Sequence, residues 1–315
     1  MTTSDLYRPP RPTISFELYP PRTPKGETQV WDTVQRLATR GADYFSVTYG
    51  ASGSTAEKSQ ALVAKIIAET SVPVIAHLTC VGRTREELRA VVEGFLDAGV
   101  RNFLALRGDA PAGETDWVPA PDGYARACDL VALIRDVEAE RFGARSDAPL
   151  ARLAAHRGGR EAVSIAVAAY PGVAGADSSD FTVGAEELVA LRAKQDAGAD
   201  FAITQLFFDA EAYRRLQAAA LAEGITLPLV PGILPLTDAA RIRKLCDLNA
   251  IPHPQELLDR LDAASDADER MHIGLRATSE LIREVLSAGA PGLHLYTFNT
   301  YDGVTALLEN ALASS

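Results

Sequence analysis

Residues 13–21 read Thr13-Ile14-Ser15-Phe16-Glu17-Leu18-Tyr19-Pro20-Pro21, an alternation of apolar and polar side chains that ends at two prolines. A period of two predicts a short β-strand with Ile14, Phe16 and Leu18 on one face. Glu17 then points to the opposite face. In a lone strand that face could simply meet water, since an ionised carboxylate is costly to bury. The meaning of Glu17 therefore depends on how the rest of the chain folds.

Seven further segments are predicted as strands, with helices between them. The strands are expected over residues 44–49, 72–79, 102–107, 163–170, 201–207, 227–231 and 293–298. The helices are expected over residues 28–40, 55–68, 85–98, 124–142, 186–197, 210–223, 238–248, 267–288 and 304–313. Glycine stands between helix and strand at four of these boundaries, as suits a left-handed residue after a helix: Gly41, Gly99, Gly198 and Gly289.

Eight strands separated by helices predict an α/β fold of the (β/α)8 TIM barrel type rather than an open Rossmann sheet. No GxGxxG motif follows the first strand, which also argues against a Rossmann nucleotide domain. We expect one domain over residues 13–315, preceded by an N-terminal extension over residues 1–12. A strand residue such as Glu17 would then face the barrel interior near its mouth.

Composition restricts the class of ligand. The chain has 315 residues and a net charge of -11, which disfavours nucleic acid or an anionic membrane surface and favours a small-molecule ligand. Cys80, Cys128 and Cys246 are widely spaced and match no zinc pattern, so no metal site is predicted. Without a signal peptide or a bilayer-spanning apolar segment, we expect a cytoplasmic protein. The oligomeric state stays open.

Polar residues at the C-terminal ends of parallel strands converge on one mouth of such a barrel. These residues are Glu17, Thr48, His77, Arg107, Asp109, Tyr170, Gln205 and Asn299. Two carboxylates in one mouth are expected to raise each other's pKa and to divide acid and electrostatic roles. Residues 110–123 are expected to cover the mouth, whereas residues 143–160 are expected to form a solvated insertion on the opposite face.

Seven ordered blocks resemble the methylenetetrahydrofolate reductase family, in order and spacing, from residue 13 to about residue 298. The blocks are Ser15-Phe16-Glu17-Leu18-Tyr19-Pro20-Pro21, Ser46-Val47-Thr48-Tyr49-Gly50-Ala51, His77-Leu78-Thr79-Cys80, Ala105-Leu106-Arg107-Gly108-Asp109, Ala168-Ala169-Tyr170-Pro171, Asp196-Ala197-Gly198-Ala199-Asp200 with Ile203-Thr204-Gln205-Leu206-Phe207-Phe208, and Val230-Pro231-Gly232-Ile233-Leu234-Pro235.

The resemblance implies reduction of 5,10-methylenetetrahydrofolate to 5-methyltetrahydrofolate with a hydride derived from NADH or NADPH. By resemblance, Glu17 is the general acid that opens the substrate ring, and Asp109 contacts the pterin and stabilises the iminium cation. Gln205 and Phe207 fall on substrate-binding positions. Positions of the family's flavin site are occupied by Thr48, Tyr49, Ala51, His77, Arg107, Gly108, Tyr170 and Lys194.

Departures from the family pattern concern the part that holds FAD by its ADP moiety. No histidine follows Tyr170-Pro171, and the basic run near Lys194 lacks one charge, although a diphosphate needs cationic or N–H donors. Thr300 replaces an arginine expected near the folate, and Leu245 replaces an aromatic residue of some members. We therefore predict direct hydride transfer without tightly bound FAD. A conventional FAD-dependent ping-pong reductase is the alternative.

Two other classes of function are weighed against the reductase. A non-catalytic folate-binding barrel would not need both Glu17 and Asp109. An unrelated barrel lyase or aldolase acting on a phosphorylated sugar would need a glycine-rich phosphate loop after the last two strands. Pro231-Gly232-Ile233 and Phe298-Asn299-Thr300 are poor candidates for such a loop.

Overall fold

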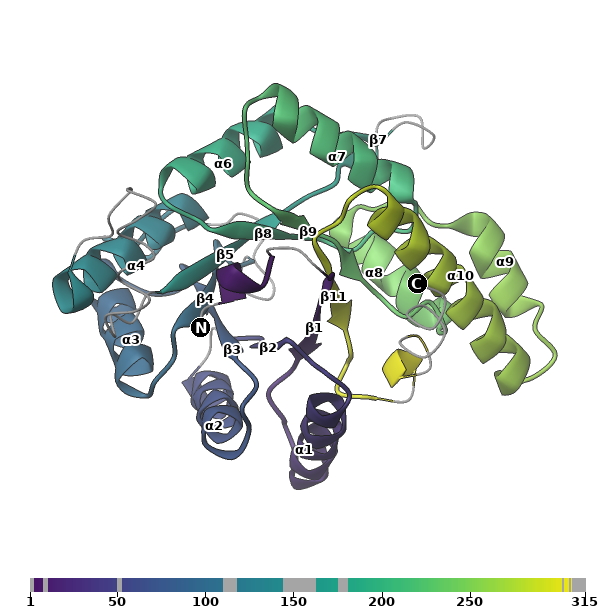
Figure 1. Ribbon diagram of the computed structural model, residues 1–315, viewed down its shortest axis with the longest axis horizontal. Coiled ribbons are helices and arrows are strands. Elements are labelled where there is room, and N and C mark those ends of the chain that lie inside the picture. The colour runs from purple at the N-terminus through teal and green to yellow at the C-terminus, as the bar shows by residue number, and fades with distance from the viewer. Residues whose placement is uncertain are drawn as a thin grey trace.

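A ring of parallel strands surrounded by helices forms the core of the computed structural model (Figure 1). The structure describes residues 3–7, 11–49, 53–109, 118–143, 163–174, 181–301, 303–305 and 307. The strands of the main sheet are β1 (Thr13–Leu18), β2 (Tyr44–Val47), β3 (Val74–Thr79), β4 (Asn102–Leu106), β5 (Ser164–Ala169), β8 (Phe201–Thr204), β9 (Leu229–Val230), β10 (Gly232–Ile233) and β11 (Gly292–Tyr296). The predicted α/β barrel is confirmed.

The helices lie outside this ring. They are α1 (Pro24–Thr39), α2 (Gly53–Glu69), α3 (Arg85–Asp97), α4 (Ala127–Phe142), α6 (Ala185–Asp196), α7 (Ala210–Ala222), α8 (Ala239–Asn249), α9 (Gln255–Asp262) and α10 (Ala267–Ser287). Thr84 caps α3 and shares the predicted capping box with Glu87. The four boundary glycines all have a positive φ, between 86° and 101°, so each ends its helix as expected.

The strand predicted over residues 227–231 corresponds to β9, and after Pro231 the chain continues as a second short strand, β10, that was not predicted. β9 pairs with β8 on one side of Pro231, and β10 pairs with β11 on the other side. His294 N donates to Pro231 O at 2.9 Å, so the ladder continues across Pro231. A Cβ on Gly232 would lie 2.3 Å from Thr204 O, so glycine allows the close approach that closes the barrel here.

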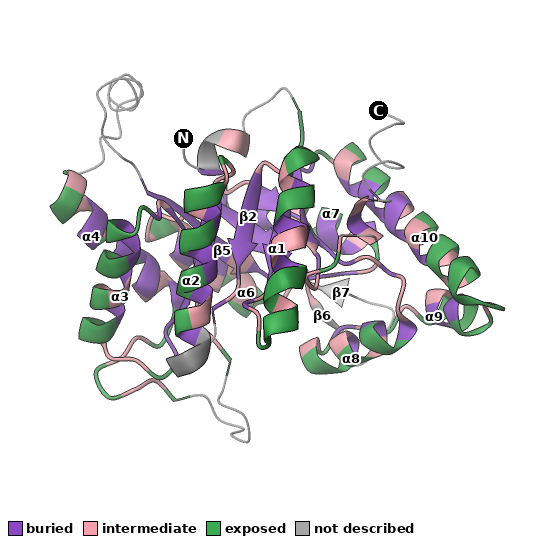
Figure 2. Cartoon of the chain, turned by 90° about the horizontal axis from the view of Figure 1, so that it is seen from below, coloured by how far each residue is buried: buried purple, intermediate pink, exposed green. Residues whose placement is uncertain are grey.

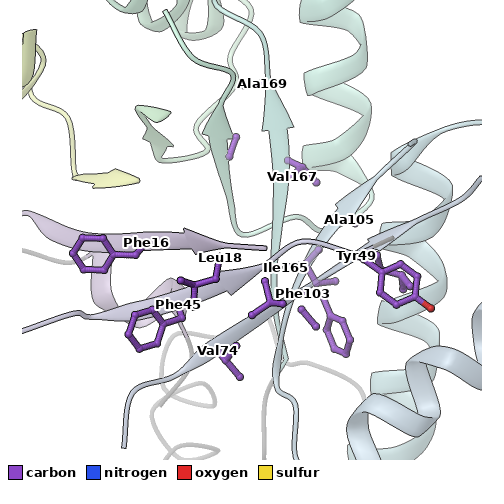
Figure 3. Close-up of a cluster of buried hydrophobic side chains, with 14 of the residues drawn as sticks. Phe16, Leu18, Phe45, Tyr49, Val74, Phe103, Ala105, Ile165, Val167 and Ala169 are labelled. Carbon is purple, nitrogen blue, oxygen red and sulfur yellow. The ribbon is translucent and has the colours of Figure 1, made fainter. Parts of the chain in front are cut away.

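The strands are buried on both faces, as the strands of a barrel must be. Ile14, Phe16 and Leu18 point outward into a large apolar cluster with the helices, as the alternation predicts. Figure 3 shows Phe16 and Leu18 with Phe45 and Phe103 of neighbouring strands in this cluster. Figure 2 shows buried strands behind helices whose outer faces are exposed. The opposite face of each strand is therefore left to form the barrel interior.

A short 3-10 helix, η1 (Thr3–Tyr7), lies against the inside of the ring (Figure 1). Thr3 N donates to Asn102 Oδ1 at 2.9 Å, and the Thr3 hydroxyl bonds Ser164 Oγ. The ring of Tyr7 packs on Phe201 at a centroid distance of 4.7 Å. Asn102 and Ser164 begin β4 and β5, so η1 fills the N-terminal end of the barrel.

An antiparallel pair of two-residue strands, β6 (Val173–Ala174) and β7 (Phe181–Thr182), was not anticipated. Ala51, residues 110–117 and residues 144–160 lie outside the described residues, as does most of the predicted helix over residues 304–313. Among the described helices, none combines the length and apolar character that crossing a bilayer would require. The described residues also contain no cluster of histidine, cysteine and carboxylate side chains that would hold a metal ion.

Candidate active site

A cavity of about 1670 Å³ opens at the C-terminal ends of the barrel strands. Its volume exceeds the roughly 300–1,000 Å³ of common ligand sites, so it has room for two ligands at once. Most of the predicted site residues line it: Glu17, Thr48, Tyr49, His77, Arg107, Gly108, Asp109, Tyr170, Lys194 and Gln205. The structure thus brings together side chains from β1 and β3, from the segments that follow β2, β4, β5 and β8, and from α6.

Glu17 lies at the inner end of this cavity, on β1, with only 7% of its surface exposed. Two imidazoles from other strands approach the same carboxylate oxygen. His77 Nε2 of β3 lies 3.9 Å from Glu17 Oε2, and His294 Nε2 of β11 lies 3.7 Å from it. These distances are too long for hydrogen bonds but allow strong charge interactions in a buried site.

The pKa of Glu17 is lowered, which reverses the sequence prediction. Burial raises this pKa, but His294, His77 and the hydroxyl of Tyr19 together outweigh burial and favour the carboxylate. Asp109, the carboxylate expected to raise it, is exposed at the rim of the cavity. The expected upward shift is therefore wrong, because the groups nearest to Glu17 are two imidazoles and a tyrosine hydroxyl rather than a second carboxylate.

His77 is held by the neighbouring strand. Ser46 Oγ of β2 lies 2.5 Å from His77 Nε2, which holds the imidazole in place at the cavity lining. Burial lowers the pKa of His77 to about 4, despite the opposing effect of Glu17. His77 is therefore neutral at pH 7 and acts on Glu17 as a polar neighbour rather than as a cation.

His294 is a site residue that the sequence analysis missed. It is fully buried on β11, directly opposite Ser15 of β1, and its Nδ1 lies 2.8 Å from Ser15 Oγ. Its Nε2 faces Glu17 and has no hydrogen-bond partner among the described residues. A usable signal was present: Leu293 and Leu295 alternate with His294 and Tyr296, which places the two polar rings on the inner face.

Gln205 lies on the opposite side of the cavity, just after β8. Its Nε2 donates to Asn249 Oδ1 of α8 at 2.8 Å, and its Oε1 accepts from Leu206 N at 2.9 Å. Asn249 and Leu245 of α8 also line the cavity. The carboxamide is thus oriented by both of its polar ends, in a place where it can meet a flat hydrogen-bonding ligand.

Two predicted site residues are placed elsewhere: the mouth residue Asn299, and Phe207, which was assigned to substrate binding by resemblance. Phe207 is buried, stacks on Tyr213 at 6.0 Å and does not line the cavity, so it is not retained as a substrate-binding residue. The reason is that β8 ends at Thr204, and the alternation of the strand no longer sets the direction of residue 207. Asn299 instead clamps Tyr19, accepting from its N–H at 2.8 Å and donating to its carbonyl at 2.9 Å.

Arg107 and Asp109 extend from a turn at Gly108 after β4. Gly108 has a φ of +88°, and a Cβ there would lie 3.1 Å from Thr79 and Val81. Only glycine combines the left-handed conformation with this close approach. The turn presents both charged side chains, which are exposed, to the same cavity.

The wall formed by β5 and α6 carries the predicted flavin residue Lys194. Its Nζ donates to Ala168 O at 2.8 Å and lies 3.8 Å from Glu187 Oε1. Glu187 also accepts from Tyr170 N at 3.2 Å. Burial lowers the pKa of Lys194 and raises that of Glu187. The ammonium group of Lys194 is thus already neighboured by a carboxylate.

The charges around the cavity suit a diphosphate poorly. Its described lining contains four carboxylates, Glu17, Asp109, Glu186 and Glu187, against three strong cations, Arg107, Arg126 and Lys194. Arg126 contacts Asp129 at 3.4 Å. Arg192, the other cation of the run near Lys194, extends toward Gly224 instead of the cavity. These residues do not fit the ADP part of FAD, which needs cationic donors.

Comparison with known proteins identifies one family. The profile of the family described as "Methylenetetrahydrofolate reductase" matches residues 4–312. The 5,10-methylenetetrahydrofolate reductases of Salmonella typhimurium and Escherichia coli are each 32% identical over 289 residues, covering 91% of this chain and 86% of theirs. "Methylenetetrahydrofolate reductase (NADH) 1" of Zea mays is 30% identical over 306 residues, covering 95% of this chain but 48% of its own.

A solved structure shares the fold. It is an uncharacterised protein from Clostridium thermocellum, described as binding two copies of 5-methyl-5,6,7,8-tetrahydrofolic acid. The two chains superpose with a TM-score of 0.58 at 13% identity, covering 95% of this chain and 94% of the other. At that identity the likeness supports the barrel architecture alone.

Proposed function

This chain belongs to the methylenetetrahydrofolate reductase family of NAD(P)H oxidoreductases, and we propose that it reduces 5,10-methylenetetrahydrofolate to 5-methyltetrahydrofolate by direct hydride transfer from NADH or NADPH. The reaction needs one proton and one hydride. The proton goes to the substrate nitrogen that departs when the five-membered ring opens, and the hydride goes to the carbon of the resulting iminium cation.

The observation that carries this proposal is the position of Glu17. Its carboxyl group is the one buried acid among the described residues that line the cavity, and it lies at the inner end, away from bulk water. A proton donor placed there is within reach of the ring of a bound heterocycle. Asp109 at the rim adds a negative charge that stabilises the iminium cation as it forms.

Direct transfer is favoured by the size of the cavity and by its charge. A volume of about 1670 Å³ accommodates a pterin and a nicotinamide side by side. Glu187 next to Lys194, and Glu186 on the same wall, oppose the binding of a flavin diphosphate. Gln205 supplies an oriented carboxamide for the pterin or for the nicotinamide amide.

An FAD-dependent ping-pong reductase is the second candidate, and one observation favours it. Of the eight positions that resemble the family's flavin site, the seven that the structure describes all line the cavity: Thr48, Tyr49, His77, Arg107, Gly108, Tyr170 and Lys194. A flavin ring would therefore meet polar neighbours there even though the wall for its diphosphate is poor. Whether the purified protein contains bound flavin distinguishes the two candidates.

The test combines flavin content with steady-state kinetics. The full chain is purified gently, its absorbance near 450 nm is recorded, and NADH oxidation with methylenetetrahydrofolate is followed at several fixed concentrations of each substrate. We expect a colourless protein with intersecting double-reciprocal lines. Stoichiometric flavin with parallel lines would support the FAD-dependent candidate. Folate binding without NADH or NADPH oxidation would leave only the non-catalytic folate-binding barrel.

A further inference from the structure

The donor and acceptor pattern around His294 is incomplete in a way that His77 is not. His77 Nε2 has Ser46 Oγ as a hydrogen-bond partner. His294 is also fully buried, but only its Nδ1 is bonded, to Ser15 Oγ. Its Nε2 points at Glu17 Oε2 from 3.7 Å and is unpartnered among the described residues. A buried polar atom without a partner is costly, so this atom needs an explanation.

Counting hydrogens shows what is missing. Ser15 Oγ has a single hydrogen, which it donates to Leu293 O at 3.0 Å. The bond between Ser15 Oγ and His294 Nδ1 therefore carries the hydrogen of Nδ1. In a neutral imidazole the other nitrogen is then a bare lone pair, and it would face an ionised carboxylate. Two acceptors would point at each other across 3.7 Å with no proton between them.

We propose that Glu17 and His294 hold one proton between them, and that His294 supplies the proton which Glu17 gives to the substrate nitrogen. The inference deepens the proposed function and rests on it for the identity of the proton acceptor. His294 acts through Glu17, since it does not line the cavity itself, and is therefore a positioning residue. The proposal requires one proton on the pair, and this proton can reside on Glu17 Oε2 or on His294 Nε2.

The groups that surround the pair do not compete for this proton near neutral pH. Burial lowers the pKa of His77 to about 4, so this neighbour from β3 is neutral. Burial raises the pKa of Tyr44 to about 12; its ring lies stacked 6.2 Å from that of His294. Burial also raises the pKa values of Tyr19 and Tyr296. Ser15 of β1 and Gly232 of β10, which also lie beside His294, do not titrate.

The arrangement solves a difficulty of the proposed reaction. A carboxyl group whose pKa is lowered would be ionised at pH 7 and could not act as an acid alone. In each turnover the pair gives one proton to the nitrogen, the C–N bond breaks with its electrons going to that nitrogen, and NADH or NADPH adds hydride to the iminium carbon. Solvent then returns one proton to the carboxylate and the neutral imidazole.

The first test measures the protonation of His294 directly and needs no substrate. The full chain is labelled with [15N]histidine, and the ring nitrogens of His294 are followed from pH 5 to pH 9 by two-bond 15N–1H correlation in the wild type and in Glu17→Gln. We expect His294 Nε2 to be protonated at pH 7 or to share the proton of Glu17, with one midpoint. The amide introduced by Glu17→Gln donates to Nε2, so the midpoint falls by at least one pH unit in the variant. Identical titrations in both proteins would overturn the inference.

The second test separates proton supply from packing. In His294→Asn, the amide keeps a donor for Ser15 but removes the nitrogen that faces Glu17. We expect kcat to fall at least tenfold, the alkaline limb of kcat to move to lower pH by at least one unit, and NADH affinity to stay within twofold. His253→Asn, on the surface beside Asp247, is the matched control with unchanged kcat.

The outcomes of the two tests distinguish a failure of the proton-supply inference from a failure of the proposed function. If His294→Asn loses affinity or stability while the alkaline limb of its kcat profile stays at the wild-type pH, then His294 has a packing role only. That result rejects proton supply by His294. A wild type that oxidises no NADH with methylenetetrahydrofolate rejects the proposed function, and the 15N titration still decides whether the pair holds a proton. If His294→Asn does not fold, the comparison of the wild type with Glu17→Gln decides alone.

Discussion

The floor and the side wall of the cavity are built from different elements and treat charge differently. On the floor, Glu17 and His77 come from two strands, and His294 of a third strand approaches Glu17 from outside the cavity lining; the parallel ladder fixes their relative positions. On the wall, Lys194 and Glu187 come from α6 and lie 3.8 Å apart. The floor surrounds one acid with imidazole and hydroxyl groups, whereas the wall places a carboxylate beside its cation. The difference is consistent with the proposed proton transfer at the floor and with the proposed weak binding of a flavin diphosphate at the wall.

Glu17→Gln is expected to produce the largest effect and tests the floor. We predict that kcat for methylenetetrahydrofolate reduction falls by about 100-fold or more, as for other lost general acids, while folate binding is retained. The measurement is NADH oxidation together with folate titration by fluorescence. Glu256→Gln on α9, outside the cavity, serves as the control. Near-normal turnover would remove Glu17 from the mechanism and leave the floor a structural feature.

The second prediction concerns how the stability of the folded protein depends on pH through the buried imidazole of His77. His77 has a pKa of about 4 in the folded protein and about 6.5 when unfolded, so only the unfolded chain takes up a proton between these values. Stability is therefore greatest above pH 6.5 and declines toward pH 4, with about 2 kcal/mol lost at pH 5. Urea unfolding at pH 7 and pH 5 measures this.

The matched variant for this stability change is His77→Asn. It should abolish most of the difference between pH 7 and pH 5, whereas His253→Asn on the surface should keep it. An unchanged pH dependence in His77→Asn would mean that the imidazole is hydrated rather than enclosed.

The strands and helix ends that position the floor and the wall could be predicted from the sequence, because they depend on local patterns of residues. The alternation of residues 13–18 gave the outward and inward faces of β1 correctly, and the boundary glycines marked the helix ends. The same alternation marks His294 and Tyr296 as inward. They were missed because neither residue belongs to a block that resembles the family motif.

What sequence could not supply were contacts between distant strands. The pKa of Glu17 depends on His77 and His294, which are 60 and 277 positions away along the chain, and its sign was predicted wrongly. The strand predicted over residues 201–207 ends at Thr204, a point that is decided by its partners in the sheet, and Phe207, assigned to the substrate by resemblance, lies beyond it. Likewise, the interruption between β9 and β10 at Pro231 is accommodated by Thr204 and Tyr296, on two other strands.

Asp109→Asn tests whether the rim contributes to chemistry as the floor does. Because Asp109 is exposed, its charge is screened, and we predict that turnover slows by about tenfold, equivalent to about 1.4 kcal/mol. Steady-state kinetics separate the two roles: a fall in kcat indicates stabilisation of the iminium cation, and a rise in KM alone indicates positioning of the pterin. The second pattern would confine the chemistry to the floor.

Glu187→Gln tests the wall and carries the smallest expected effect. Removing the carboxylate charge 3.8 Å from Lys194 Nζ leaves that cation available to a phosphate ligand. The gain for a partly buried ion pair is about 1 kcal/mol, or roughly fivefold in affinity. We therefore predict tighter binding of FAD and of ADP, measured by calorimetry, with little change in kcat.

Two further variants on the wall isolate the ion pair. Lys194→Gln should weaken the binding of FAD and ADP, because it removes the cation itself. Glu186→Gln is the comparison, since Glu186 lies on the same wall but has no ion pair to Lys194 among the described contacts. Equal FAD affinity in the wild type and in Glu187→Gln would show that the wall does not decide flavin binding. Backbone donors or Arg107 would then hold the diphosphate, and the contrast with the floor would lose its functional meaning.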